Sequence, residues 1–330
     1  MKKKTIVISA SMSDESKARV ESVFDGVGDV RYLEDRGEDG RAVTLKDADI
    51  LISFSFNREI DREEYRLLGN LELLQTISTG VDYLPFSEIP SNITIACNAG
   101  GWAYQIAEHS VAMIMALYRR FVPQHNKLAG GVFDRNGYEL RNLRGSTFCA
   151  VGYGGIGRHT AAMLRPFGVK IMALNTSGRT DDEVDFVGTL GDINSVLEKT
   201  DIVLLSIPLT RDTEGLIGKE RLGMMKPDAC LINVARAPLV DERALYEHLK
   251  ANPDFLAGLD VWWEEPTWSD SRFHINYPFF DLPNFLGSPH NSNYVRNSFA
   301  DAAVAASENV RTFLEGKRPG GLIRREDYVK

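Results

Sequence analysis

Short apolar runs rich in Val, Ile and Leu recur along the chain, separated by longer amphipathic stretches. Because these runs are continuously apolar instead of alternating with polar residues, they predict strands buried on both faces, as in parallel sheets. Ten runs fit this description: TIVIS (5–9), ADILISFS (48–55), LELLQTIS (71–78), NITIACN (92–98), TFCAVGYG (147–154), VKIMALN (169–175), DIVLLSIP (201–208), ACLINVA (229–235), LAGLDVW (256–262) and NFLGSPH (284–290).

Helix-like segments lie between these runs. Apolar residues at helical spacing predict helices over residues 14–24, 104–121, 155–166, 241–250 and 294–315. Strands that alternate with helices form open, doubly wound sheets. The pattern therefore predicts an α/β protein built on parallel sheets.

The segment QIAEHSVAMIMALYRRF (105–121) is apolar on most faces until its basic end, which predicts a buried helix packed between two domains. The small-residue and Pro/Gly breaks NAGG (98–101) and GSPHNS (287–292) are suited to hinges. We therefore expect a discontinuous domain of residues 1–100 and 290–330, and a central domain of residues 101–289.

Composition narrows the class of protein. The 330 residues carry a net charge of −8 with a pI near 5.4, which argues against a general nucleic-acid binder. Cys97, Cys149 and Cys230 lie in apolar runs without a CxxC pair, as expected for buried thiols in a reducing compartment. The start MKKKTIVISA is typical of a first strand, and no apolar run approaches the roughly 18 residues of a membrane span. A cytoplasmic protein without membrane contact is expected.

The stretch FCAVGYGGIGR (148–158) carries the motif Gly152-x-Gly154-x-x-Gly157, with Gly155 and Ile156 between the last two glycines. A predicted strand precedes the motif and a predicted helix follows it, which is the context required for dinucleotide binding. The three glycines would allow a tight turn, close approach to a pyrophosphate, and close helix–strand packing. The central domain is therefore predicted to be a Rossmann dinucleotide-binding domain.

The end of the next strand bears on the choice of dinucleotide. An NAD site usually has Asp or Glu there to bind the ribose 2′-hydroxyl. This chain has Asn175, followed by Thr176, Ser177 and Arg179, whose hydroxyls and guanidinium suit a 2′-phosphate. NADP(H) is favoured and NAD(H) stays possible, since Asn175 could bind a 2′-hydroxyl while Arg179 lies in solvent.

Three later strands each end on a polar residue. LINVARAPL provides Arg236, LAGLDVWWEEP provides Asp260 and the pair Glu264 and Glu265, and NFLGSPHNS provides His290. Each has an ordinary structural explanation taken alone, such as a surface arginine, a polar turn or a core histidine. Strand carboxyl ends line the ligand crevice of open α/β sheets, so together they predict a cation, a carboxylate and an imidazole beside the cofactor.

The glycine motif and the three polar strand ends belong to longer segments that resemble a known protein family. With ISTGVDYLPF, NAGGWAYQIAEHSVAMIMAL and LLSIPLTRDTEGLIGKERLGMMKPDACLINVARAPLVDERAL, the chain resembles the D-isomer-specific 2-hydroxyacid dehydrogenases over nearly its whole length. The resemblance implies two α/β domains, with a flavodoxin-like, discontinuous substrate domain beside the Rossmann domain.

Roles follow from the resemblance. His290 would donate a proton to the 2-keto oxygen of a small 2-keto acid or withdraw one from a 2-hydroxy acid, while Glu265 orients the ring and raises its pKa. Arg236 would hold the substrate carboxylate and polarise the 2-oxygen. The substrate carboxylate would also meet the backbone N–H groups of Thr79 and Gly80, and Asp260 would bind the nicotinamide carboxamide. Loops over the cofactor would include Ile207, Pro208, Val234 and Ala235.

Departures from the family pattern leave several points open. Ser206 stands where a histidine is common, and Trp102 and Tyr104 either limit a substrate side chain or pack at the helix start. Glyoxylate, hydroxypyruvate and related 2-keto acids fit a compact member, and a short 3-phosphoglycerate dehydrogenase is an alternative. A nucleotide-sensing corepressor on the same fold is a second alternative. A homodimer is expected, with helix 104–121 in or near the contact, and six histidines without ligand spacing predict no metal.

Overall fold

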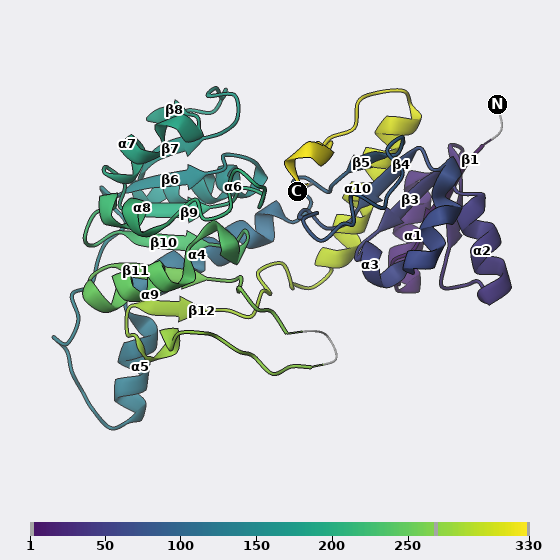
Figure 1. The fold of residues 1–330 in the computed structure, drawn as a ribbon. Coiled ribbons are helices and arrows are strands. Elements are labelled where there is room, and N and C mark those ends of the chain that lie inside the picture. The colour runs from purple at the N-terminus through teal and green to yellow at the C-terminus, as the bar shows by residue number, and fades with distance from the viewer. Residues whose placement is uncertain (1–2, 267–269, 329–330) are drawn as a thin grey trace. The chain divides into compact units, whose positions relative to one another are not determined.

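The chain forms two compact units in the computed structural model, which describes residues 3–266 and 270–328 (Figure 1). The first unit comprises Met1–Trp102 and Tyr294–Lys330, and the second comprises Ala103–Asn293. The predicted C-terminal segment of the substrate domain starts at residue 290, whereas the first unit resumes at Tyr294. His290 consequently belongs to the second unit.

The first unit is built on a five-stranded sheet in the order β2-β1-β3-β4-β5, with every pairing parallel. This order is the flavodoxin-like doubly wound arrangement, so the predicted fold class is confirmed for this unit. Helix α1 (Asp14–Val23) contacts α10 (Ser298–Leu314), and α2 (Glu38–Lys46) contacts the 3₁₀ segment η1 (Arg62–Asn70). The strands are β1 (Lys4–Ile8), β2 (Gly28–Tyr32), β3 (Ile50–Ser53), β4 (Leu73–Thr76) and β5 (Thr94–Ala96).

The helices of the first unit come from both ends of the chain. Their bounds are α1 (Asp14–Val23), α2 (Glu38–Lys46), α3 (Phe56–Glu59), η1 (Arg62–Asn70), α10 (Ser298–Leu314) and η6 (Arg325–Asp327). Helix α10 begins later than the predicted residue 294, because Asn297 adopts a left-handed φ of 65° just before it. Packing of α10 on β3 and β4 joins the C-terminal segment to the N-terminal sheet.

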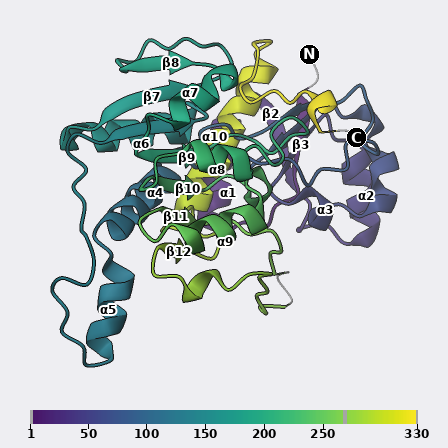
Figure 2. The same ribbon diagram turned by 60° about the vertical axis from the view of Figure 1, so that its left-hand side comes forward.

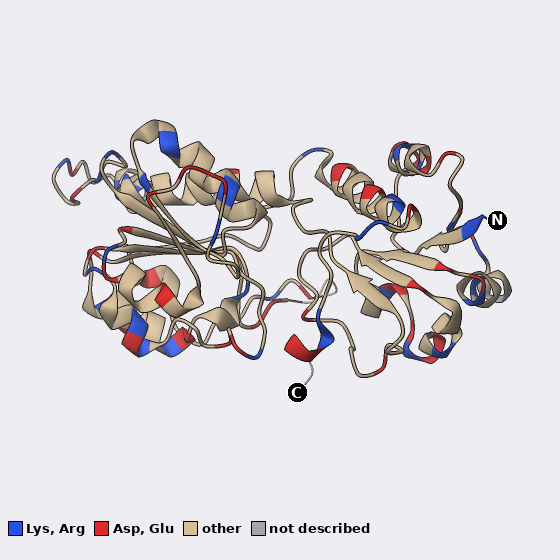
Figure 3. Cartoon of the chain, turned by 90° about the horizontal axis from the view of Figure 1, so that it is seen from above, with Lys and Arg blue, Asp and Glu red and all other residues tan. Residues whose placement is uncertain are grey.

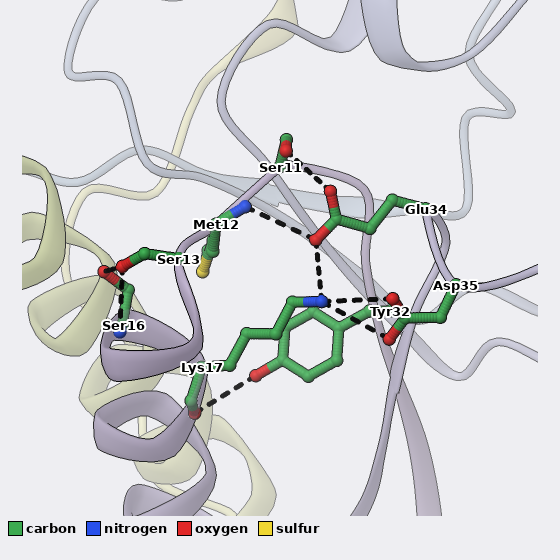
Figure 4. A network of polar contacts seen from close by, with 8 residues as sticks. All are labelled: Ser11, Met12, Ser13, Ser16, Lys17, Tyr32, Glu34 and Asp35. Carbon is green, nitrogen blue, oxygen red and sulfur yellow. Dashed lines mark hydrogen bonds and ion pairs between the residues drawn. The ribbon is translucent and has the colours of Figure 1, made fainter.

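A polar network fixes the turn from β1 into α1 (Figure 4). The Lys17 ammonium lies 2.8 Å from Glu34 and 3.1 Å from Asp35, and the hydroxyl of Ser11 donates to Glu34. These contacts, first of all the bond from Lys17, hold the pKa of Glu34 below its usual value. The network joins the segment after β2 to the first turn of α1.

The second unit contains a seven-stranded sheet in the order β12-β11-β10-β9-β6-β7-β8, again parallel throughout. Among its described strand residues, Lys170 is the one that carries a charge, and charges gather instead on helices and loops (Figure 3). Such apolar strands explain why six of its seven strands were predictable from the sequence. The strands are β6 (Thr147–Val151), β7 (Lys170–Leu174), β8 (Phe186–Gly188), β9 (Ile202–Leu205), β10 (Cys230–Asn233), β11 (Leu256–Leu259) and β12 (Phe285–Gly287).

Helices cover both faces of this sheet. One core joins alternate strand residues to α4 and α6, and the other joins the remaining ones to α7, α8 and α9. The α-helices are α4 (Ala103–Tyr118), α5 (Phe121–Ala129), α6 (Gly155–Leu164), α7 (Ile193–Leu197), α8 (Lys219–Met224) and α9 (Glu242–Ala251). The 3₁₀ segments are η2 (Arg165–Phe167), η3 (Leu190–Asp192), η4 (Ala237–Leu239) and η5 (Phe279–Asp281).

The predicted helix 104–121 ends early. Arg120 has a left-handed φ of 50° that separates α4 from α5, and α5 extends away from the sheet of its own unit (Figure 2). No residue of α5 is buried. The apolar helix therefore stops where its buried face stops.

Other predictions concern single features. Cys97, Cys149 and Cys230 are buried and free, as expected. None of the helices in residues 3–266 and 270–328 combines the length and apolar character needed to span a membrane. The same residues contain no group of three or more His, Cys, Asp or Glu side chains placed to hold a metal ion.

Candidate active site

The glycine motif forms the turn from β6 into α6. Gly152 has a φ of +103°, and a Cβ built on it would lie 2.5 Å from the carbonyl oxygen of Ser206. A Cβ on Gly157 would lie 2.5 Å from the carbonyl oxygen of Gly152 and 2.9 Å from Cβ of Ala150. Both positions therefore require glycine to let strand, turn and helix approach each other.

Gly154 differs from these two glycines, because the protein itself leaves room for a side chain there. It immediately precedes α6, and a Cβ built there would meet no protein atom within 4 Å. Its lack of a side chain leaves the backbone open to a ligand, at a helix N-terminus whose first N–H groups have no partner within the helix. Gly155 and Ile156 form the first turn of α6. These residues fit the pyrophosphate of a dinucleotide.

The loop after β7 is ordered by Asn175. Its side-chain oxygen accepts from the N–H groups of Ser177 and Gly178, and its amide nitrogen donates to the carbonyl of Arg179. Thr176, Ser177 and Arg179 are exposed. Asn175 therefore shapes the loop that would surround the 2′ position, and the sequence alone did not indicate this role.

Arg236 follows β10 on a turn shaped by Asn233. The buried Asn233 side chain donates to the carbonyl of Arg236 and accepts from the N–H of Ala235. The half-buried guanidinium of Arg236 donates to the carbonyl of Ala235 at 2.8 Å. Asn233 is not among the residues predicted from the sequence, because a single Asn at a strand end carries no spacing signal.

His290 and Glu265 form a close pair. Nδ1 of His290 lies 2.9 Å and 2.8 Å from the two carboxylate oxygens of Glu265. His290 has a left-handed φ of 50°, a conformation that costs a non-glycine residue about 1 kcal/mol. The strained residue is thus the one predicted to transfer a proton.

The surroundings of Glu265 stabilise its ionised form. Partial burial alone would raise the pKa of this carboxyl group, but the bond from His290, the N–H of Trp262 and the charge of Arg236 together lower it. Glu265 is therefore a carboxylate near neutral pH. Its ionised form can accept the Nδ1 proton of His290, which leaves Nε2 as the atom that can exchange a proton with a ligand.

Asp260 directly follows β11 and is fully buried. Its Oδ1 accepts from the Ser288 hydroxyl at 2.6 Å and from the Asn291 N–H at 3.2 Å, and its Oδ2 accepts from the Ser292 N–H at 3.1 Å. Three donors satisfy most of the acceptor positions of this carboxylate. Asp260 therefore holds the segment on which His290 lies.

The remaining candidate residues lie in loops. In the second unit, Ser206 donates to the carbonyl of Gly152, which ties the end of β9 to the glycine turn. In the first unit, Thr79 follows β4 and its hydroxyl donates to the carbonyl of Asn98. Loop residues of the second unit at the ends of β9 and β10 are Ile207, Pro208, Val234 and Ala235, and Gly80 follows Thr79 in the first unit.

Two aromatic residues near the start of α4 have different environments. Trp102 is buried in the first unit and its indole donates to the carbonyl of Ile77 at 2.7 Å. Tyr104 is 53% exposed and its ring meets His159 edge-on. Trp102 is therefore a packing residue, whereas Tyr104 offers an exposed ring.

Comparison with known proteins identifies the class. The model of the "D-isomer specific 2-hydroxyacid dehydrogenase, NAD binding domain" family matches residues 111–292. The chain belongs to this family of oxidoreductases and binds a nicotinamide dinucleotide.

Individual relatives cover most of the chain. A glyoxylate reductase of Thermofilum pendens is 33% identical over 288 residues, which are 86% of this chain and 83% of that protein. A D-3-phosphoglycerate dehydrogenase of Methanocaldococcus jannaschii is 27% identical over 91% of this chain, but this chain spans 56% of that protein. The solved structure of an acyclic imino acid reductase in complex with NADPH and D-Arg is similar with a TM-score of 0.74 and 26% identity, over 97% of this chain and all of that one.

Proposed function

We propose that this protein reduces a small 2-keto acid to the 2-hydroxy acid and uses NADPH in preference to NADH. The observation that carries the proposal is the His290–Glu265 pair at 2.8 Å, at strand ends of the unit that also holds the glycine turn. A dinucleotide bound there would supply the hydride for C2 of the substrate. The reverse oxidation uses the same groups.

The chain's own residues provide the proton and the charge. His290 would give the Nε2 proton to the developing 2-oxyanion, and Glu265 would stabilise the imidazolium beforehand. Arg236 would hold the substrate carboxylate by a two-pronged hydrogen bond and polarise the 2-oxygen. The N–H groups of Thr79 and Gly80 in the first unit would bind a substrate carboxylate, and Asp260 would bind the nicotinamide carboxamide.

Cofactor preference depends on the loop after β7. Thr176, Ser177 and Arg179 are exposed donors, and none of the four residues from Asn175 to Gly178 is an acid that would repel a 2′-phosphate. A charged donor beside a phosphate gives a strong hydrogen bond. The loops that carry Ile207, Pro208, Val234 and Ala235 would cover the rest of the cofactor.

The substrate class is glyoxylate, hydroxypyruvate or a related 2-keto acid. The similarity to the glyoxylate reductase of Thermofilum pendens supports this, because it extends over 83% of that protein. The test is the loss of nicotinamide absorbance with NADPH and then NADH against glyoxylate, hydroxypyruvate, pyruvate and phosphohydroxypyruvate. Turnover of one of the first three supports the proposal. Turnover of the phosphorylated acid alone would identify a 3-phosphoglycerate dehydrogenase, and tight cofactor binding without turnover would favour a nucleotide sensor.

A cytoplasmic homodimer completes the proposal. Phe121 and Leu128 of α5 and Phe133 after it are 60%, 56% and 75% exposed, and free buried cysteines suit a reducing compartment. Light scattering should give twice the 36.8 kDa chain mass. A monomer that stays monomeric at high concentration would contradict this part.

A further inference from the structure

A histidine outside the predicted catalytic set is connected to it through one hydroxyl. His109 lies on α4, and its Nε2 is 2.9 Å from the Ser288 hydroxyl oxygen. The same hydroxyl is 2.6 Å from Oδ1 of the buried Asp260, while Nε2 of His109 is 3.7 Å from that oxygen. A row of polar contacts therefore connects helix α4 with the ends of β11 and β12.

The direction of these bonds is determined by the number of protons. A serine hydroxyl has one proton, and Ser288 donates it to the carboxylate of Asp260. The contact between Nε2 of His109 and Ser288 can then be a hydrogen bond only if Nε2 carries a proton. His109 is therefore the donor to Ser288, and Ser288 is in turn the donor to Asp260.

Asp260 connects these hydrogen bonds to the backbone next to His290. It accepts from the N–H groups of Asn291 and Ser292, the two residues that follow His290. Those two bonds fix the chain immediately after a residue with a left-handed φ of 50°. Such a conformation persists only where the surroundings determine it.

We propose that His109 is a positioning residue for the reaction, and that it holds His290 in its strained, Glu265-bound geometry through Ser288 and Asp260. The inference rests on the proposed role of His290 as proton donor. Trp262 provides a separate tie, since its indole donates to the carbonyl of Ser288 and its N–H donates to Glu265. Loss of the Ser288 hydroxyl therefore loosens the segment without releasing it.

The test uses the full-length chain and a cycle of variants. His109→Leu and Ser288→Ala should each lower kcat by about tenfold or more, with KM for the 2-keto acid within about threefold of the original, because misplacement affects chemistry more than binding. The double variant should lose no more than the worse single variant, since both act through one route. His109→Gln should recover most of the rate, because its amide nitrogen can donate at the same place. Ser110→Ala is the matched control, because this hydroxyl bonds within α4 to the carbonyl of Ile106.

A readout without substrate or cofactor separates positioning from activity. The His290 Nδ1 proton bonded to Glu265 should give a downfield proton NMR signal, assigned by its loss in His290→Gln. That signal should broaden or disappear in His109→Leu and return in His109→Gln. The inference would be overturned by an unchanged kcat and NMR signal in His109→Leu. It would also be overturned by additive losses of rate in the double variant, or by a His109→Gln variant that recovers no activity. Full activity of His290→Gln would instead refute the proposed function, whatever the His109 variants do.

Discussion

The Nδ1 atom of His290 lies 2.8 Å from Oε2 of Glu265, and the two residues follow different strands, β12 and β11. Adjacent parallel strands bring their carboxyl ends to one edge of a sheet, so residues 25 apart in sequence become direct partners. The pair is partly exposed, with 39% and 38% of the two side chains accessible. Its contribution is therefore expected in catalysis more than in folding.

Glu265→Gln should lower kcat/KM for reduction by roughly 10²-fold, because the amide no longer stabilises the imidazolium that donates the proton. Glu264→Gln is the matched control, since this neighbouring carboxylate is exposed and Nδ1 of His290 bonds to Glu265. Initial rates over a pH range measure both. The lowered pKa of Glu265 means that its protonation reduces activity only once the pH has fallen below the usual carboxyl range. Equal rates for the two glutamine variants would contradict this role.

Arg236→Lys should lower kcat/KM by about 10²-fold although the charge is retained, because an ammonium cannot make two parallel bonds to a carboxylate. The control is Arg243→Lys on α9, an exposed arginine that pairs with Glu247 one helical turn away. Steady-state kinetics at saturating cofactor separates kcat from KM. A variant with normal turnover would remove Arg236 from the substrate site.

The two glycines around α6 should respond differently to alanine. Gly154→Ala should fold with normal stability, because no protein atom lies near the new Cβ, but should bind the dinucleotide more weakly. Gly157→Ala should lower the free energy of unfolding by about 1–3 kcal/mol, because the Cβ would overlap the carbonyl of Gly152. Urea unfolding without cofactor and fluorescence titration with cofactor distinguish the two effects. Normal cofactor affinity of Gly154→Ala would contradict the assignment of the phosphate site.

Arg179→Gln should weaken NADPH binding by about tenfold while leaving NADH binding unchanged, because only the 2′-phosphate needs the guanidinium. This variant is a cleaner test than Asn175→Asp, which should also shift preference toward NADH. Asn175 donates to the carbonyl of Arg179, and an aspartate would lose that donor and disturb the loop. The measurement is the dissociation constant of NADPH and of NADH for each variant. Equal losses for the two cofactors would show that the effect is not specific to the phosphate.

His248 should make the protein less stable in mild acid. Burial lowers the pKa of this imidazole, which packs edge-on against Phe255. The unfolded chain therefore takes up a proton first, and stability falls as the pH drops below the ordinary histidine pKa of about 6.5. His248→Phe should lose less stability than the original protein between pH 7.5 and 5.5, measured by urea unfolding. Identical pH dependence would rule out His248 as the source.

Local sequence patterns predicted most strands of both units. Each of the ten apolar runs contains a strand of the structure. A strand that is buried on both faces is continuously apolar, so it can be recognised without tertiary information. The turn at Gly152, Gly154 and Gly157 was equally readable, because its glycines satisfy local requirements of backbone conformation and close approach. Strands β2 and β8 were missed. GDVRY in β2 is polar and partly exposed, and β8 has two apolar residues between Asp185 and Gly188, so neither shows a continuous apolar run.

The sequence by itself therefore determined ten of the twelve described strands, the family resemblance and the types of residue that could carry the chemistry. Tertiary structure decided which of them meet: Glu265 with His290, Asp260 with the N–H groups after His290, and His109 with Ser288. The helical break at Arg120 and the loop function of Asn175 also became visible only in three dimensions. The physical reason is that periodicity records burial along one element, whereas hydrogen bonds between side chains depend on the register of neighbouring elements.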